Sequence, residues 1–228
     1  MKLSIIIPTY NEEAVISRLL QYLLQHTSAS TEIILADGCS EDATVAMAEK
    51  LGVRVIKCSR KGRAPQMNTG AAAASGDVLY FLHADTFPPA NLEALLQEAV
   101  QKKYGSGCFR LRFDDPHWFL KLNAWFTRFD VDAVRFGDQS LFVQKDIFDK
   151  AGGFDECFLL LEDQEIISRI RRAAPFVVLP FCVTTSARKY RQHGVYRLQA
   201  YYFYIYTLYK LGMPQPELLK VYKRLLAL

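Results

Sequence analysis

The first 85 residues alternate between short apolar runs and segments with a helical pattern. The apolar runs, which read as buried strands, cover residues 3–7, 32–36, 53–56 and 78–82. The predicted helices between them cover residues 15–23, residues 40–50 after a capping Ser40, and the alanine-rich residues 64–74. This alternation predicts an α/β fold in which helices flank a mostly parallel, Rossmann-like sheet.

The second half of the chain is less regular. Helices are predicted at residues 91–100, 118–129, 162–173 and 196–211, and strands at residues 107–113, 139–143 and 176–179, where Pro180 ends the last strand. We expect one domain over residues 1–190 and a helical C-terminal extension over residues 191–228 that is rich in aromatic and basic side chains. No apolar run is long enough to predict a membrane-spanning helix.

The charge distribution and the cysteines indicate where the protein is located and what it binds. The formal net charge is +4, but residues 188–228 carry +7 and residues 1–187 carry −3. The five cysteines include no CxxC pair, which predicts reduced thiols rather than disulfides or a zinc site. The N-terminus enters the first strand without a signal-peptide pattern. These features predict a cytoplasmic protein, with a peripheral place at the inner face of the membrane left open and no nucleic-acid partner expected.

The fourth predicted strand delivers two metal-binding residue types to its end. Residues 78–82 are apolar, and His83 and Asp85 follow with one residue between them. Ligands in parallel α/β sheets bind beyond the carboxyl ends of the strands. An imidazole and a carboxylate at that edge predict a site for a divalent cation, Mn²⁺ or Mg²⁺, and a phosphate group.

The first strand is followed by a turn without glycine. A Rossmann dinucleotide site needs a glycine-rich turn there, whereas residues 8–12 contain none, and the chain has no Walker loop. A nucleotidyltransferase also usually begins with a glycine-rich, basic loop. A nucleotide bound here must therefore be held mainly by side chains and a cation.

Four ordered motifs resemble the signatures of family 2 glycosyltransferases. They are residues 5–12, 36–44, 76–85 and 161–163. The His-Ala-Asp form, with residues 62–68 and 186–188, resembles a small bacterial subgroup. The resemblance covers residues 1–190 and implies a GT-A fold, with a nucleotide-binding half at 1–85 and an acceptor half at 86–190. It also implies an inverting, metal-dependent enzyme that uses a nucleotide-diphosphate sugar and an unknown acceptor.

The resemblance assigns roles around the donor nucleotide. Pro8, Tyr10 and Glu12 would line the base and ribose pocket. Asp37, with Gly38 beside it in the same turn, would accept a hydrogen bond from the base, which is most often uracil in this family.

The resemblance also assigns roles at the sugar-diphosphate end of the donor. Arg63 and Asn68 would lie near the two phosphates, for which a planar guanidinium is well suited. His83, Ala84 and Asp85 would take the place of the Asp-x-Asp motif, where the cation bridges both phosphates.

The acidic pair Glu162 and Asp163 would stand at the catalytic position, and Asp163 matches the general base. A carboxylate on the face opposite the leaving group can activate an acceptor hydroxyl.

One residue departs from the family pattern, and it leaves alternatives open. Imidazole suits manganese better than magnesium, so His83 either binds metal or contacts the ribose, while Asp85 is the expected ligand. A degraded metal motif also fits a non-catalytic nucleotide-sugar-binding or scaffold protein on the same fold. Structural roles compete for Glu12, Asp37 and the acidic pair, because acids are common in first helical turns and strand-end turns.

The aromatic segment 196–209 has two interpretations. With the basic tail, its tyrosines suit a membrane interface and a lipid-linked acceptor. Because they are not confined to one helical face, packing against the body or a homodimer partner is the preferred interpretation.

Overall fold

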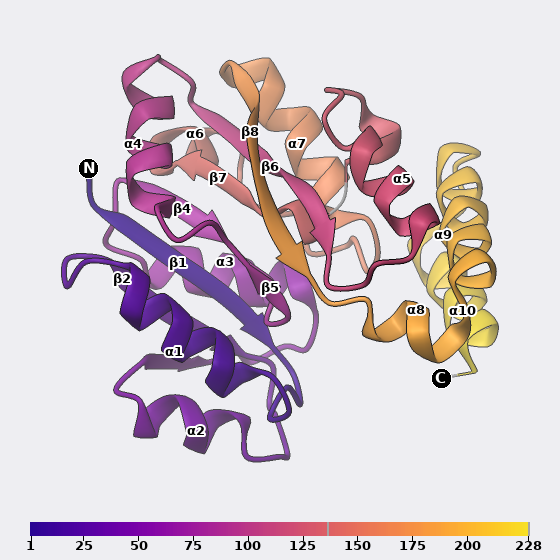
Figure 1. The fold of residues 1–228 in the computed structure, drawn as a ribbon, viewed down its shortest axis with the longest axis horizontal. Coiled ribbons are helices and arrows are strands. Elements are labelled where there is room, and N and C mark those ends of the chain that lie inside the picture. The colour runs from indigo at the N-terminus through magenta and orange to yellow at the C-terminus, as the bar shows by residue number, and fades with distance from the viewer. Residues whose placement is uncertain (136, 228) are drawn as a thin grey trace.

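The computed structural model describes residues 1–135 and 137–227, which form an eight-stranded sheet with helices on both faces (Figure 1). The strands are β1 (Leu3–Thr9), β2 (Glu32–Asp37), β3 (Arg54–Lys57), β4 (Val78–Phe81), β5 (Thr86–Phe87), β6 (Ser106–Phe113), β7 (Leu141–Gln144) and β8 (Phe176–Thr185). The α-helices are α1 (Ile16–His26), α2 (Thr44–Lys50), α3 (Arg63–Ala73), α4 (Leu92–Gln101), α5 (Trp118–Phe126), α6 (Lys145–Lys150), α7 (Glu162–Ala173), α8 (Arg188–His193), α9 (Val195–Lys210) and α10 (Gln215–Leu226). Two 3-10 turns, η1 (Asp132–Val134) and η2 (Gly137–Gln139), precede β7.

The strand order is β3-β2-β1-β4-β7-β6-β8-β5. Pairing is parallel from β3 to β4 and between β6 and β8, whereas β7 runs antiparallel to both of its neighbours and β5 antiparallel to β8. The carboxyl ends of β1, β2 and β4 therefore meet at one edge of the sheet. The prediction of an α/β fold with a mostly parallel sheet is confirmed.

Both faces of the sheet are covered, which explains the uninterrupted apolar run of β1. Ile5 and Ile7 pack in the core with α1 and α4, while Ile6 packs on the opposite face with α3 and α7. All three side chains are fully buried. A strand buried on both faces needs apolar residues at every position rather than at alternate ones.

The prediction that Pro180 ends the last strand is wrong, because β8 continues to Thr185. The pairing of β6 with β8 moves from Phe109–Leu179 to Arg110–Cys182, so Pro180 and the next residue bulge out of the ladder. A proline is tolerated at a bulge because no ladder hydrogen bond is required of its nitrogen there.

The predicted cap of the second helix is also wrong. The helix α2 begins at Thr44, whose N–H donates to Oδ1 of Asp42. The Ser40 hydroxyl instead accepts the N–H of Asn11. Its own N–H donates to Oδ2 of Asp37, which keeps this part of the chain in a loop at the end of β2.

The helices α8, α9 and α10 form a group at the end of the molecule opposite α1 and α2 (Figure 1). They share a small core with α5, made of Leu120, Ala187, Tyr190, Leu198 and Leu226. Among the helices that the structure describes, none combines the length and the apolar character needed to cross a bilayer.

Candidate active site

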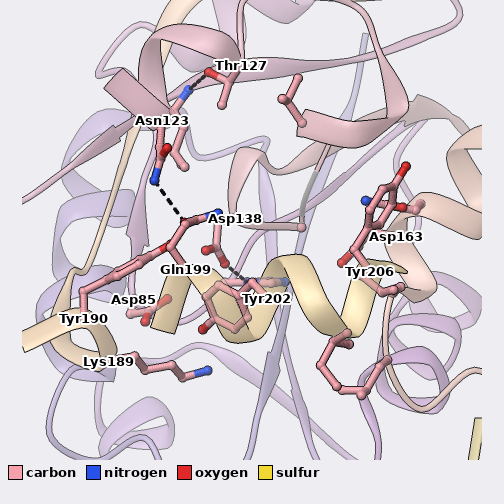
Figure 2. A pocket seen from close by; sticks show the side chains of 18 of the residues that line it. Asp85, Asn123, Thr127, Asp138, Asp163, Lys189, Tyr190, Gln199, Tyr202 and Tyr206 are labelled. Carbon is pink, nitrogen blue, oxygen red and sulfur yellow. Dashed lines mark hydrogen bonds and ion pairs between the residues drawn. The ribbon is translucent and has the colours of Figure 1, made fainter. Parts of the chain in front are cut away.

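A cavity of about 330 Å³ opens beyond the carboxyl ends of β1 and β4. The charged side chains in its wall come from six parts of the chain, represented by Glu12, Arg63, Asp85, Asp138, Asp163 and Lys189. Residues far apart in the sequence thus face one space at the edge where α/β proteins bind ligands. Figure 2 shows the side chains around it.

Two adjacent carboxylates enter the cavity at the start of α7. Glu162 and Asp163 are only 3% and 8% exposed. Burial, reinforced by the negative charge of Glu162, raises the pKa of Asp163 to about 7. The first turn of a helix offsets part of this cost because its N–H dipoles favour negative charge.

Arg63, at the first position of α3, balances this acidic pair. Its guanidinium lies 3.7 Å from Oε1 of Glu162, an oxygen that has no hydrogen-bond partner among the described residues. The arginine side chain is half exposed, so one side of the guanidinium stays open to the cavity. It can face a second anion without giving up Glu162.

His83 is buried beside this group and pairs with Asp138 from η2. Its Nδ1 lies 3.1 Å from Oδ1 of Asp138. Burial opposes protonation, but the bond to Asp138 raises the pKa of His83 above its ordinary value. Burial likewise opposes ionisation of Asp138, yet the bond to His83 holds the pKa of that carboxyl at about 2. The pairing therefore shifts His83 towards its imidazolium form and Asp138 towards its carboxylate.

Gly137 allows these groups to come together. A Cβ atom at this position would overlap Oδ2 of Asp163 and stand 2.9 Å from Cε1 of His83. Only glycine lets the backbone before β7 approach both side chains.

At the other end of the cavity, Asp85 lies near Glu12. Oε2 of Glu12 is 3.5 Å from the guanidinium of Arg188. Burial raises the pKa of Glu12; Arg188 counteracts this, and the charge of Asp85 adds to it. Asp85 itself has no ion-pair partner among the described residues. Within residues 1–135 and 137–227, no group of three His, Cys, Asp or Glu side chains is arranged to hold a metal ion alone.

The residues predicted to hold the base lie beside the cavity, at the ends of β1 and β2. Asp37 is buried, pairs in register with Thr9, and has one oxygen, Oδ1, without a donor in the described structure. Tyr10 is 44% exposed and carries the ammonium of Lys61 4.4 Å above its ring. Gly38 accommodates Gln66, whose amide fixes the ends of β1 and β2 through the carbonyls of Thr9 and Ala36.

Asn68 is placed differently from its predicted role near the phosphates. It is absent from the cavity wall, and its amide donates to the carbonyl of Phe154 at 2.9 Å and to Glu156 at 3.1 Å. Its carbonyl oxygen accepts the Phe154 N–H at 2.8 Å. All of these bonds anchor the loop before α7, so the structure gives Asn68 a scaffolding role.

The far wall of the cavity was not predicted from the sequence. Gln199, Tyr202 and Tyr206 line it from α9, which the sequence suggested as a membrane, packing or dimer surface. The spacing of three and four residues between them was the available signal. Oε1 of Gln199 accepts hydrogen bonds from Asn123 at 3.0 Å and from Tyr190 at 2.9 Å (Figure 2).

The last helix supports the loop that leads into the acidic pair. Oε1 of Gln215, at the start of α10, accepts the N–H groups of Leu159 and Leu160, both at 3.1 Å. Leu161 then adopts a left-handed conformation, with φ of 64°, at the N-cap of α7. The approach to Asp163 thus depends on a contact from the C-terminal helices.

Solved structures to which the chain is similar include two glycosyltransferases. The mannosyltransferase PcManGT from Pyrobaculum calidifontis, solved with GDP-Man and Mn²⁺, matches 99% of this chain and 68% of its own with a TM-score of 0.72 and 18% identity. A structure of S. aureus TarS 1-349 with UDP-GlcNAc matches 82% of this chain and 58% of its own with a TM-score of 0.67 and 18% identity. At this identity the likeness shows the fold, which is GT-A.

Sequence comparison identifies the family. An uncharacterized glycosyltransferase of Haemophilus influenzae is 29% identical over 191 residues, covering 76% of this chain and 63% of its own length. The model of glycosyl transferase family 2 matches residues 4–154, which is more than half of the chain. The chain therefore belongs to glycosyl transferase family 2.

Proposed function

We propose that this chain transfers a sugar from a nucleoside-diphosphate donor to an acceptor hydroxyl with inversion at the anomeric carbon. Asp163 carries the proposal, because it is a buried carboxylate with a pKa of about 7 in the cavity beyond the strand ends. A base with a pKa near the working pH is ionised and still able to take a proton. The complexes of PcManGT with GDP-Man and of TarS with UDP-GlcNAc support a nucleotide-sugar donor.

For the donor we propose a UDP-sugar. Pro8 and Glu12 line the cavity on its β1 side, where the ribose would bind. Tyr10 offers an exposed ring for the base, and Asp37 beside Gly38 offers a carboxylate oxygen without a donor. A uracil N–H would satisfy that oxygen.

The diphosphate would lie between the basic side chains and Asp85. We propose that Asp85 holds a divalent cation, Mn²⁺ or Mg²⁺, because it is a cavity carboxylate without an ion-pair partner among the described residues. Donor oxygens and water would complete the ligand set, and Ala84 leaves room beside it. When bound, the cation supplies charge neutralisation at the leaving diphosphate. Arg63 would bind the phosphate oxygens on the opposite side.

We assign His83 to the diphosphate rather than to the metal. A metal ligand must be a neutral imidazole, whereas the pairing with Asp138 raises the pKa of His83 and favours its charged form. An imidazolium donates a charge-assisted hydrogen bond to a phosphate oxygen.

The transfer step uses one enzyme base. The acceptor oxygen bonds to the anomeric carbon as the bond from that carbon to the diphosphate oxygen breaks, and the hydroxyl proton goes to Asp163. The negative charge of Glu162 keeps Asp163 basic. Direct attack opposite the leaving group inverts the configuration.

The acceptor site, in this proposal, includes the C-terminal helices. Tyr202, Tyr206 and Gln199 present rings and an amide to the cavity, a lining that suits a polyhydroxylated acceptor. We therefore propose that residues 191–228 complete the acceptor half at residues 86–190.

The test combines calorimetry with donor turnover. We expect UDP to bind more tightly than GDP, only with Mn²⁺ or Mg²⁺, and Asp85→Ala to abolish this binding. The wild type should slowly release UDP from UDP-sugars by transfer to water. The Asp163→Asn variant should lose this activity and keep its affinity for UDP. Binding of neither nucleotide under any metal condition would overturn the proposal. Donor binding without turnover of any UDP- or GDP-sugar would favour the alternative, a non-catalytic nucleotide-sugar-binding protein.

A further inference from the structure

The helix α5 presents an aromatic face to solvent. The face consists of Trp118, Leu122, Trp125, Phe126 and Phe129, and its members are 61%, 41%, 45%, 42% and 44% exposed. At 100° per residue the four members within α5 fall on one side of the helix, opposite the buried Leu120, and Phe129 follows in the turn after the helix. An apolar patch of this kind marks an interaction site rather than ordinary surface.

Both tryptophans of the chain belong to this face. Tryptophan is usually well buried, so two exposed tryptophans on one short helix are unusual. The rings of Trp125 and Phe129 lie 5.1 Å apart, and Trp118 lies 6.4 Å from Tyr196 of α9. They therefore form a preassembled aromatic surface rather than scattered side chains.

Unpaired cations border the aromatic face on the β6 side. A groove of about 560 Å³ between β6 and α5 is lined by Arg110, Arg112, Lys121 and Arg128. None of the four has an ion-pair partner among residues 1–135 and 137–227. The two acids in the groove, Asp114 and Asp115, are already paired with Arg191 at 3.1 and 3.3 Å.

The cations and the aromatic face form one continuous surface. Trp125 lines the groove, and the guanidinium of Arg128 lies 4.6 Å from the centre of its ring. On the other side, Phe126 lies in the wall of the candidate active site. Figure 1 shows α5 at the periphery, between β6 and α9.

We propose that this surface docks the protein on an anionic lipid bilayer, with the aromatic face in the headgroup region and lipid phosphates against the four cations. Tryptophan and phenylalanine flanked by Lys and Arg are typical of interfacial helices. A second copy of the chain fits less well, because a symmetric contact would bring two sets of unpaired cations together. The docking does not depend on the transfer reaction.

The two tryptophans make the wild-type protein its own probe. With vesicles of equimolar phosphatidylcholine and phosphatidylglycerol, we expect the tryptophan emission to shift to the blue and brominated lipid to quench it. Vesicles of phosphatidylcholine alone should produce little of either effect. Unchanged emission with anionic vesicles, or an equal response to both compositions, would overturn the proposal.

Matched variants test whether vesicle binding depends on this surface rather than on net charge or overall hydrophobicity. Arg112→Gln, Lys121→Gln and Arg128→Gln together should weaken vesicle binding about 100-fold. The control Lys50→Gln, Lys57→Gln and Lys103→Gln removes the same charge from exposed positions elsewhere and should change binding no more than about threefold.

The aromatic face needs its own variant. Trp125→Ser with Phe129→Ser should abolish vesicle sedimentation, whereas Leu24→Ser with Leu211→Ser, which alters apolar side chains exposed elsewhere, should not. If the protein instead forms a dimer without lipid, and that dimer is lost in Trp125→Ser with Phe129→Ser, the face is covered by a second copy and the lipid proposal fails.

Discussion

Asp163 occupies a position where ionisation is unfavourable and, in the proposed reaction, useful. Its carboxylate is buried, adjacent to Glu162, and overlain by the backbone of Gly137. Burial and like charge together favour the protonated form. Strongly shifted carboxylates in a cavity are typical of catalytic acids and bases.

The first prediction concerns the pH dependence of turnover. In the proposed reaction Asp163 acts as a base only when ionised, and its pKa is about 7, so turnover at saturating donor should rise about tenfold per pH unit below pH 7 and level off above it. A stopped assay of nucleotide release across this range measures the profile. A flat profile from pH 5 to pH 8 would remove Asp163 from the role of base.

The second prediction concerns stability. The folded-state pKa of Asp163 lies above its ordinary value of 3.8, so the folded state loses stability as the pH rises from about 4 to about 7. Asp163→Asn removes this loss. The variant should match the wild type near pH 4 and exceed its free energy of unfolding by about 4 kcal/mol at pH 8. Urea titrations at the two pH values measure the difference; equal stabilities at pH 8 would contradict it.

The third prediction separates the two roles considered for Asn68. Asn68→Ala would leave the N–H and C=O of Phe154 without partners, so we expect a loss of about 1–3 kcal/mol in unfolding free energy and UDP affinity within about twofold of wild type. The control is Thr69→Ala on the same helix, because its hydroxyl donates to the carbonyl of Pro65 within α3 and not to the loop before α7. A large drop in UDP affinity at unchanged stability would restore the phosphate role.

At the scale of elements, the sequence predicts features that depend on local pattern and misses features that depend on tertiary contacts. The bounds of α7 agree with the prediction because acids in the first turn, arginines in the last and isoleucines at helical spacing all indicate one helix. The strand β8 was shortened in the prediction because a bulge at Pro180 depends on its partner β6. The short helices α6 and α8 were not predicted, since each has only six residues and little periodicity.

The candidate site shows the same division. The ends of β1, β2 and β4 could be identified from the motifs, because the parallel sheet brings strand ends together. The pairing of His83 with Asp138 joins residues 55 apart, and that of Asn68 with Phe154 residues 86 apart. Neither contact has a local signature. The cavity-facing side of α9 was hidden because aromatic residues occupy all sides of that helix.

The fourth prediction tests α9 as a wall of the acceptor site. Gln199→Ala removes the acceptor shared by Asn123 and Tyr190, so we expect about 1–2 kcal/mol lower stability and a raised KM for the acceptor at unchanged UDP affinity. Tyr204→Ala, at an exposed position of the same helix, is the control. If Gln199→Ala weakens UDP binding as much as it raises the acceptor KM, α9 does not act on the acceptor side alone.

At the scale of the whole molecule, ligand binding and stability are linked. In the proposed function UDP with Mn²⁺ binds only the folded chain, and it should therefore raise Tm by several degrees at about 100 times the Kd. As the fifth prediction, we expect no shift in Tm from UDP with a chelator, and none from UDP with Mn²⁺ in the Asp85→Ala variant. A full shift in the Asp85→Ala variant would place the cation elsewhere. Differential scanning fluorimetry measures all three conditions.

The contact of Gln215 with Leu159 and Leu160 has a consequence for biosynthesis. The sheet is complete once Thr185 has been made, but the loop leading to Asp163 is not fastened until α10 follows. A nascent chain that stops short of α10 would contain the strands of the donor edge and the α9 segment but lack this support. In the proposed reaction, the donor edge is thus synthesised before the contact that supports the loop leading to the base.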